Sequence, residues 1–128
     1  MKKKIKEKNK KLIILDLDNT IWKGTIGDDS IEQINIDLSD PVGSVYRCVQ
    51  NIFLDLKNKG FLLAICSKNN EELALKALFN SKKSLLKESD IVSYKINWKA
   101  KSQNIKEICN ELNISLKETI FIDDSAYE

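Results

Sequence analysis

The chain has 128 residues, 42% of them hydrophobic, and this suffices for one folded domain with a buried core. It contains no histidine, which excludes a histidine general base and a histidine-ligated metal. Its three cysteines lack the spacing of a metal site, which favours reduced thiols and a cytoplasmic location.

The net charge of +2 conceals a basic N-terminus ahead of an acidic remainder, because residues 1–11 hold seven lysines and one glutamate. This stretch has neither arginine nor aromatic residues, so we interpret residues 1–10 as a solvated leader without a nucleic-acid role. Residues 11–128 are then expected to form the folded domain. No run of eighteen apolar residues is present, so no membrane interaction is expected.

The first predicted elements are a strand, an irregular segment and a helix. Residues 11–17, "KLIILDL", form a short apolar run typical of a buried strand. Residues 19–40 contain two glycines and alternating isoleucines, which predict a loop with a small hairpin. A helix follows, with Asp40 as its N-cap, Pro41 in its first turn and Gly60 at its end. Its apolar residues recur at spacings of three and four, namely Val42, Val45, Tyr46, Val49, Ile52, Phe53 and Leu56.

Strands and helices alternate through the rest of the chain. We predict strands over 61–66, 90–96 and 119–122, and helices over 71–80 and around 105–112. Cys48 and Cys109 lie on helix faces and are interpreted as packing residues. Alternation with unbroken apolar strands predicts an α/β fold, a parallel sheet covered by helices on both faces.

Polar clusters follow three of the predicted strands. Asp16 and Asp18 come after the first, residues 66–69 ("CSKN") end the second, and Asp123 and Asp124 follow the last. Because the carboxyl ends of parallel strands meet at one edge of a sheet, these clusters should lie together. Carboxylates gathered there repel one another, and Mg²⁺ would relieve that repulsion.

The same cluster has the groups that phosphoryl transfer requires. A carboxylate can attack phosphorus, and a second one can protonate the leaving oxygen and then activate water. The Ser67 hydroxyl and the ammonium of Lys99 or Lys101 would hold the phosphoryl oxygens.

These features resemble the four motifs of the haloacid dehalogenase (HAD) superfamily: "DLDNT", Ser67 after an apolar strand, a lysine before a helix, and "FIDDS". The resemblance implies a Rossmannoid three-layer sandwich. No large insertion separates the motifs, so the cap should be minimal, a small hairpin only. The superfamily usually adds a strand and a helix after the fourth motif, so we expect a domain shortened at its C-terminus.

A narrower resemblance, to the FkbH-like subgroup, rests on "DLDNTIWKGTIGDD", "LAICSKNN", "INWKAKSQNIKEICNELN" and "FIDDSAYE". It implies transfer of the glyceryl unit of 1,3-bisphosphoglycerate, a phosphorylated three-carbon substrate, onto an acyl carrier protein in polyketide or tetronate biosynthesis. Two alternatives stay open. One is a stand-alone Mg²⁺-dependent phosphatase acting on a small phosphorylated metabolite, and the other is a non-catalytic docking domain of a larger protein.

The resemblance assigns roles to the four aspartates. Asp16 corresponds to the nucleophile and Asp18 to the general acid/base. Asp16, Asp123 and the backbone carbonyl of Asp18 would bind Mg²⁺, with support from Asp124.

It also assigns the residues around the phosphoryl group. Ser67 would bind that group, and Asn69 would add a polar contact to the substrate. The subgroup's "Asn-Trp-x-x-Lys" pattern selects Lys101 as the site lysine, with Lys99 as the fallback.

Cys66 is a further candidate, because a protein thiol could hold the glyceryl group before the carrier does. The competing interpretation is a buried cysteine that acts as a small apolar residue, on the side of the strand opposite Ser67. A nucleophilic Cys66 should be partly exposed. Trp22 and Trp98 are interpreted as packing aromatics.

Overall fold

The computed structural model describes residues 10–26 and 39–124. The predicted leader, apart from Lys10, and most of the predicted hairpin segment lie outside these residues. Strands β1 (Leu12–Leu15), β2 (Leu62–Lys68), β3 (Ser93–Asn97) and β4 (Thr119–Ile122) form one sheet in the order β3-β2-β1-β4. Every pairing in it is parallel, which confirms the predicted α/β fold.

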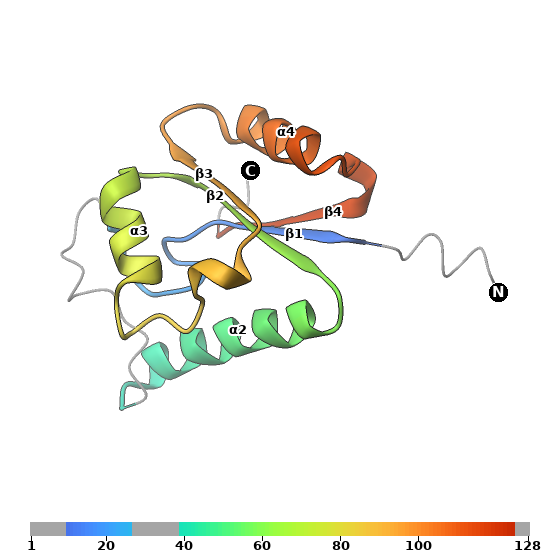
Figure 1. The fold of residues 1–128 in the computed structure, drawn as a ribbon. Coiled ribbons are helices and arrows are strands. Elements are labelled where there is room, and N and C mark those ends of the chain that lie inside the picture. The colour runs from blue at the N-terminus through green and yellow to red at the C-terminus, as the bar shows by residue number, and fades with distance from the viewer. Residues whose placement is uncertain (1–9, 27–38, 125–128) are drawn as a thin grey trace.

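Helices cover both faces of this sheet, as Figure 1 shows. Helices α2 (Pro41–Asn58) and α3 (Glu71–Phe79) lie on one side, and α4 (Lys101–Leu112) lies on the other. Short 3₁₀ helices, η2 (Glu88–Asp90) and η3 (Leu116–Glu118), precede β3 and β4. Because η2 takes up the first residue of the predicted third strand, β3 starts later than expected. Within the described ranges, no helix combines the length and the apolar composition needed to cross a membrane.

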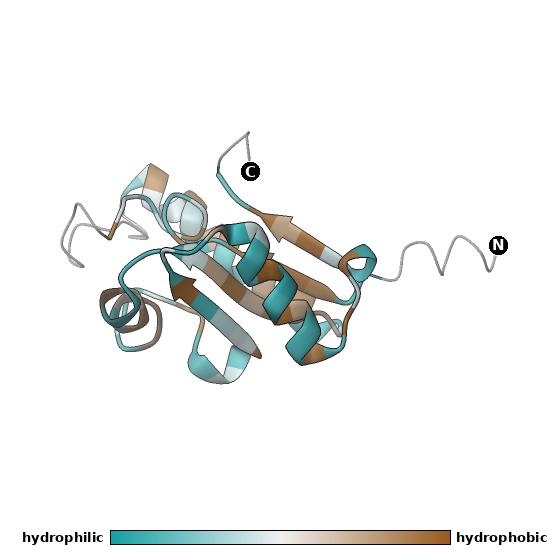
Figure 2. Cartoon of the chain, turned by 90° about the horizontal axis from the view of Figure 1, so that it is seen from above, coloured by the Kyte–Doolittle hydropathy of each residue, from teal (hydrophilic) through white to brown (hydrophobic). Residues whose placement is uncertain are grey.

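Two apolar cores hold the three layers together, one on each face of the sheet. Successive side chains of a strand point to opposite faces, so Ile13 and Leu15 join the core beneath α2 and α3. Leu12 and Ile14 join the core beneath α4. All four are at most 2% exposed. Figure 2, which looks down on the α4 side, shows apolar strands beneath a helix whose outward residues are hydrophilic.

The ends of α2 agree with the prediction. The Asp40 carboxylate accepts a hydrogen bond from the Val42 amide at 2.9 Å, which caps the helix, and Pro41 is its first residue. Gly60 follows the helix with a φ of +110°, a conformation that glycine adopts without strain.

The predicted apolar face of α2 is only partly buried. Phe53 packs into the core, but Val42, Val45 and Ile52 are 47%, 60% and 55% exposed. The polar Gln50 is fully buried instead. Its side chain donates to the carbonyl of Ile21 and accepts from the amide of Leu85, both at 2.8 Å. The spacing of apolar residues therefore predicted too many buried positions on α2. It also could not identify Gln50, a polar residue that is buried because it finds hydrogen-bond partners inside the protein.

The strand order places the predicted polar clusters together. Strand β1 lies between β2 and β4, so the residues that follow it have neighbours on both sides. The amide of Asp16 donates to the carbonyl of Ile122 at 3.0 Å, which extends the β1–β4 pairing to the start of the acidic segment. The chain therefore reaches Asp16, Ser67 and Asp123 at adjacent points of one sheet edge.

Candidate active site

Asp16 is a buried carboxylate at the carboxyl end of the central strand, with 6% of its surface exposed. One oxygen accepts a hydrogen bond from the Leu17 amide at 2.7 Å, and the other accepts from the Lys101 ammonium at 3.0 Å. Burial raises the pKa of Asp16 from 3.8 to about 6, although both hydrogen bonds oppose this shift. A carboxylate in this position is poorly hydrated and held in one orientation.

Lys101 joins Asp16 to Asp123. Its ammonium lies 3.0 Å from Asp16 Oδ2 and 2.6 Å from Asp123 Oδ2. Burial by itself would lower the pKa of Lys101, but the hydrogen bonds to Asp123 and Asp16 raise it above its usual value. The site therefore keeps a cation between two carboxylates at neutral pH.

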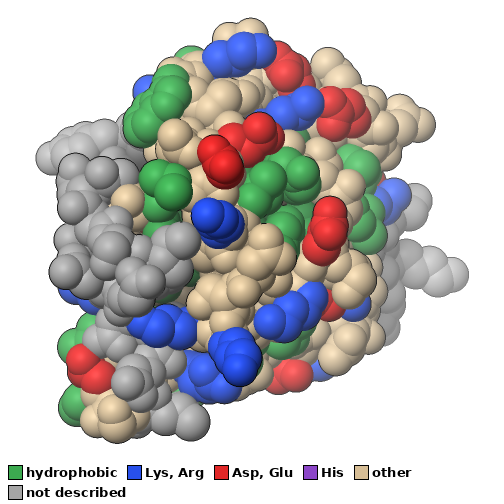
Figure 3. All heavy atoms as spheres, turned by 60° about the vertical axis from the view of Figure 1, so that its left-hand side comes forward, with side chains coloured by type: hydrophobic (Ala, Val, Ile, Leu, Met, Phe, Trp, Pro, Cys, Tyr) green, Lys and Arg blue, Asp and Glu red, His purple; other side chains and the backbone are tan. Residues whose placement is uncertain are grey.

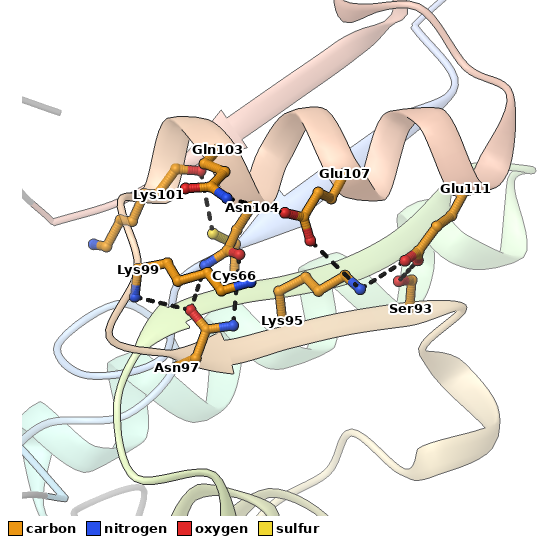
Figure 4. Close-up of polar contacts among 10 residues, drawn as sticks. All are labelled: Cys66, Ser93, Lys95, Asn97, Lys99, Lys101, Gln103, Asn104, Glu107 and Glu111. Carbon is orange, nitrogen blue, oxygen red and sulfur yellow. Dashed lines mark hydrogen bonds and ion pairs between the residues drawn. The ribbon is translucent and has the colours of Figure 1, made fainter.

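Of the two candidate lysines, Lys101 is the one that reaches the acidic cluster. Lys99 is exposed, and its backbone amide donates to the Asn97 side chain at 3.0 Å. In Figure 4 the Lys101 side chain extends away from Asn97, whereas that of Lys99 runs alongside the Asn97 and Asn104 amides.

Three carboxylates form a group suited to a metal ion. Asp16, Asp123 and Asp124 each offer one oxygen, and these oxygens lie within 4.8 Å of one another. Burial raises the pKa of Asp124, as do the hydrogen bond and the charge of Asp123. An all-oxygen donor set with such mutual repulsion fits Mg²⁺. The predicted role of the Asp18 carbonyl stays a prediction.

Asp18 is held by three donors on a tight turn. Its Oδ1 accepts from the Trp22 indole at 3.0 Å and from the Ile26 amide at 3.1 Å, and its Oδ2 accepts from Asn69 at 2.9 Å. The turn depends on Asn19, which has a φ of 57°. Trp22 is fully buried, as a packing residue would be, but sequence reasoning missed its bond to Asp18. Their spacing of four residues was the only signal available.

Ser67 and Asn69 stand beside Asp18 at the end of β2, and each is 2% exposed. The Asn69 amide that binds Asp18 also lies 3.5 Å from the Ser67 hydroxyl. The structure thus brings the proposed acid/base and the proposed phosphoryl-binding hydroxyl to one amide group. Figure 3, turned so that this side of the molecule comes forward, shows acidic and basic side chains close together near the middle of the face and a group of basic side chains below them.

Comparison with protein families supports the interpretation of this sheet edge as a candidate active site. Residues 11–128 match the model of the NLI interacting factor-like phosphatases, a family of the HAD-like superfamily. The chain belongs to this family. A comparison with curated proteins gives no match.

A solved structure is similar to this NLI interacting factor-like domain over 96% of its length. It is the N-terminal part of the protein BF1531 from Bacteroides fragilis, containing a phosphatase domain complexed with Mg. The two share 40% sequence identity, with a TM-score of 0.91. Our chain covers 33% of that chain, about a third of its length.

Burial of Cys66 in this domain agrees with its interpretation as a small apolar residue, whereas Cys48 departs from its prediction. Cys66 is fully buried in the core beneath α4, which contradicts the partial exposure expected of a nucleophile. Its thiol donates a weak hydrogen bond to the Lys101 carbonyl at 3.8 Å. Strand alternation places this thiol on the face of β2 opposite Ser67. Cys109 is buried, as predicted for packing, but Cys48 is exposed, so its assignment as a packing residue is wrong.

Trp98 is not a packing residue either, because 69% of its surface is exposed. It lies in the turn between β3 and α4. In this turn the Asn97 side chain accepts hydrogen bonds from the backbone amide of Lys99 and from the side-chain amide of Asn104. This turn leads directly into Lys101, the first residue of α4.

Proposed function

We propose that this domain is a Mg²⁺-dependent phosphoryl-transfer enzyme that forms an aspartyl phosphate on Asp16. The observation that carries the proposal is the shared contact of Lys101 with Asp16 and Asp123 at the carboxyl edge of the sheet. The Mg complex of the BF1531 phosphatase domain supports the choice of metal. A docking module without catalysis has no need for this charged and partly buried set.

In the first half-reaction, a carboxylate oxygen of Asp16 attacks phosphorus while the bond from phosphorus to the leaving oxygen breaks. Asp18 donates its proton to that leaving oxygen. Trp22, Ile26 and Asn69 hold Asp18 in place for this step.

In the second half-reaction, Asp18 takes a proton from water, and that water attacks the phosphorus bound to Asp16. Phosphate leaves and the Asp16 carboxylate is restored. Lys101 and Ser67 hold the phosphoryl oxygens throughout, so that the charge developing on them meets preorganised donors.

Asp16, Asp123, Asp124 and the backbone carbonyl of Asp18 are the groups proposed to hold the metal. When bound, Mg²⁺ supplies charge neutralisation for the phosphoryl oxygens and for the carboxylates themselves. Without it, Lys101 is the cation that the described residues place among these carboxylates.

The finer proposal is glyceryl transfer from 1,3-bisphosphoglycerate to an acyl carrier protein, which rests on the FkbH-like motifs. A glyceryl thioester carries no phosphate, so two bonds to phosphate must break. Asp16 suits the phosphate ester, and a thiolate must displace the acyl phosphate. Because Cys66 is fully buried, the acceptor thiol is assigned to the carrier protein and not to this cysteine.

The experiment is to incubate the protein with 1,3-bisphosphoglycerate, Mg²⁺ and candidate carrier proteins, and to measure intact masses. Glyceryl on the carrier supports the finer proposal. Release of inorganic phosphate without loading supports the alternative, a phosphatase for a small phosphorylated metabolite. If 1,3-bisphosphoglycerate keeps both of its phosphates, both glyceryl transfer and phosphatase activity are contradicted.

A further inference from the structure

The turn between β3 and α4 is closed by a pair of asparagine side chains (Figure 4). Asn104, fully buried in the first turns of α4, donates to Asn97 Oδ1 at 2.7 Å. Asn97, the last residue of β3, returns a longer bond of 3.5 Å to Asn104 Oδ1. The same Asn97 oxygen accepts from the Lys99 amide at 3.0 Å, so one side chain fixes both arms of the turn.

The start of α4 lacks the usual means of fixing a helix N-terminus. Its N-cap residue is Ala100, which has no side-chain acceptor, and no capping hydrogen bond is formed there. The backbone amide of Asn104 donates to the Ala100 carbonyl at 3.2 Å, which is a bond within the helix. The Asn97–Asn104 pair links this first turn back to β3, and the Cys66 thiol makes a weaker contact from β2 to the Lys101 carbonyl at 3.8 Å.

The first residue after Ala100 is Lys101, whose ammonium must lie within hydrogen-bond distance of Asp16 and of Asp123 at once. A rotation or slide of the helix start would move the Lys101 backbone, so its side chain would have to leave its present rotamer to keep both contacts. Misplacement of a catalytic group by about 1 Å can cost on the order of 100-fold in rate.

We infer that Asn97 and Asn104 are positioning residues for Lys101. They act by fixing the β3–α4 turn. None of the contacts described above joins either asparagine to Asp16 or Asp123. The inference rests on the proposed function, because it assumes that Lys101 takes part in phosphoryl transfer.

The other end of α4 offers a matched control. There Glu111 receives hydrogen bonds from Lys95 at 2.6 Å and from Ser93 at 3.2 Å, so it joins the same strand to the same helix (Figure 4). Its side chain is half-exposed, and it lies at the far end of the helix from Lys101. If the amide pair merely held two elements together, breaking this contact would have a similar effect on turnover.

The test measures kcat and KM for p-nitrophenyl phosphate with saturating Mg²⁺. Asn97→Ala should lower kcat by about 10- to 100-fold with KM changed by less than about threefold. Asn97→Asp keeps the oxygen that accepts from Lys99 and Asn104 and loses only the longer bond that Asn97 donates to Asn104 Oδ1, so it should retain kcat within about threefold of the wild type. Glu111→Ala, which removes the oxygens that accept from Lys95 and Ser93, should also retain kcat within about threefold of the wild type.

A double-mutant cycle distinguishes positioning from general support of the fold. In a Lys101→Ala background, Asn97→Ala should lower kcat no further, because the group that it positions is already gone. Thermal melts of each variant check that it is folded. If Asn97→Ala does not fold, Asn97→Ser and Asn104→Leu replace it in the same cycle.

Each outcome bears on one claim. A fall in kcat for Asn97→Ala that disappears in the Lys101→Ala background supports the inference. Wild-type kcat in Asn97→Ala, multiplicative losses in the double variant, or an equal loss in Glu111→Ala overturns it and leaves the proposed function standing. Wild-type kcat in Lys101→Ala would remove Lys101 from the proposed function and overturn the inference with it.

Discussion

Replacing Asp16 by asparagine should stabilise the metal-free protein at neutral pH, although it removes the proposed nucleophile. Burial raises the pKa of Asp16 from 3.8 to about 6, so the folded protein holds this proton more tightly than the unfolded chain does. Below about pH 3 the carboxyl is protonated in both states. As the pH rises through about 4 and then 6, the unfolded state ionises first, and the free energy of unfolding falls.

The magnitude follows from the shift itself. At about 1.36 kcal/mol per pKa unit, the full penalty is about 3 kcal/mol, of which about 2 kcal/mol develops between about pH 4.5 and 7.5. Asp16 is 6% exposed, so solvent screens little of it. Asparagine keeps the size of the side chain and an acceptor for the Leu17 amide, and Lys101 keeps its contact with Asp123.

The assay is urea unfolding of the wild type and Asp16→Asn in EDTA, at about pH 4.5 and 7.5. The variant's advantage in unfolding free energy should grow by about 2 kcal/mol between these conditions. With millimolar Mg²⁺ the advantage should shrink, because the ion binds the ionised carboxylate of the folded state. Asp55→Asn, a change of an exposed carboxylate on α2, is the control. An advantage of Asp16→Asn that is the same at both pH values would refute the reasoning.

Two further changes test Asp18 and the indole that contacts it, and a third tests the buried side chain of Gln50. Asp18→Asn should keep the fold and slow turnover by about 10²–10⁴-fold, measured as phosphate release at saturating substrate; near-normal turnover would remove Asp18 as the acid/base. Trp22→Phe keeps the aromatic packing but deletes one of three donors to Asp18, so kcat should fall about 10-fold with little change in melting temperature; unchanged kcat would show that the indole does not position Asp18. Gln50→Leu leaves the Ile21 carbonyl and the Leu85 amide without this partner, so urea unfolding should show a loss of about 2–3 kcal/mol, and a loss below about 0.5 kcal/mol would contradict the role assigned to this buried amide.

The sequence was a good guide wherever position along a strand decided the outcome. An apolar strand such as Leu12–Leu15 can only be buried on both faces, and this requires helices on both sides of a parallel sheet. The same geometry brings residues that follow different strands, such as Asp16 and Asp123, to one edge. The choice of Lys101 over Lys99 came instead from the resemblance to the FkbH-like pattern, and Lys101 is the lysine that contacts both carboxylates.

Side-chain partners across the fold were not accessible in this way. Whether Trp22 donates to Asp18 depends on the turn at Asn19, and whether Cys66 is exposed depends on how closely α4 packs on β2. Spacing gave Cys66 its side of the strand but not its exposure. The exposed Trp98 likewise depends on how the turn after β3 is closed, which the one-dimensional pattern does not contain.

The central claim is that phosphoryl groups pass through Asp16, and trapping that intermediate tests it most directly. The protein is mixed with Mg²⁺ and acetyl phosphate, quenched rapidly in acid, digested and analysed by mass spectrometry, with Asp18→Asn included because slower hydrolysis should preserve the intermediate. We predict one added phosphoryl group on the peptide that contains Asp16, more abundant in Asp18→Asn and absent from Asp16→Asn. Turnover of acetyl phosphate by the wild type with the label absent from Asp16, or carried by another side chain such as Ser67, would contradict the account.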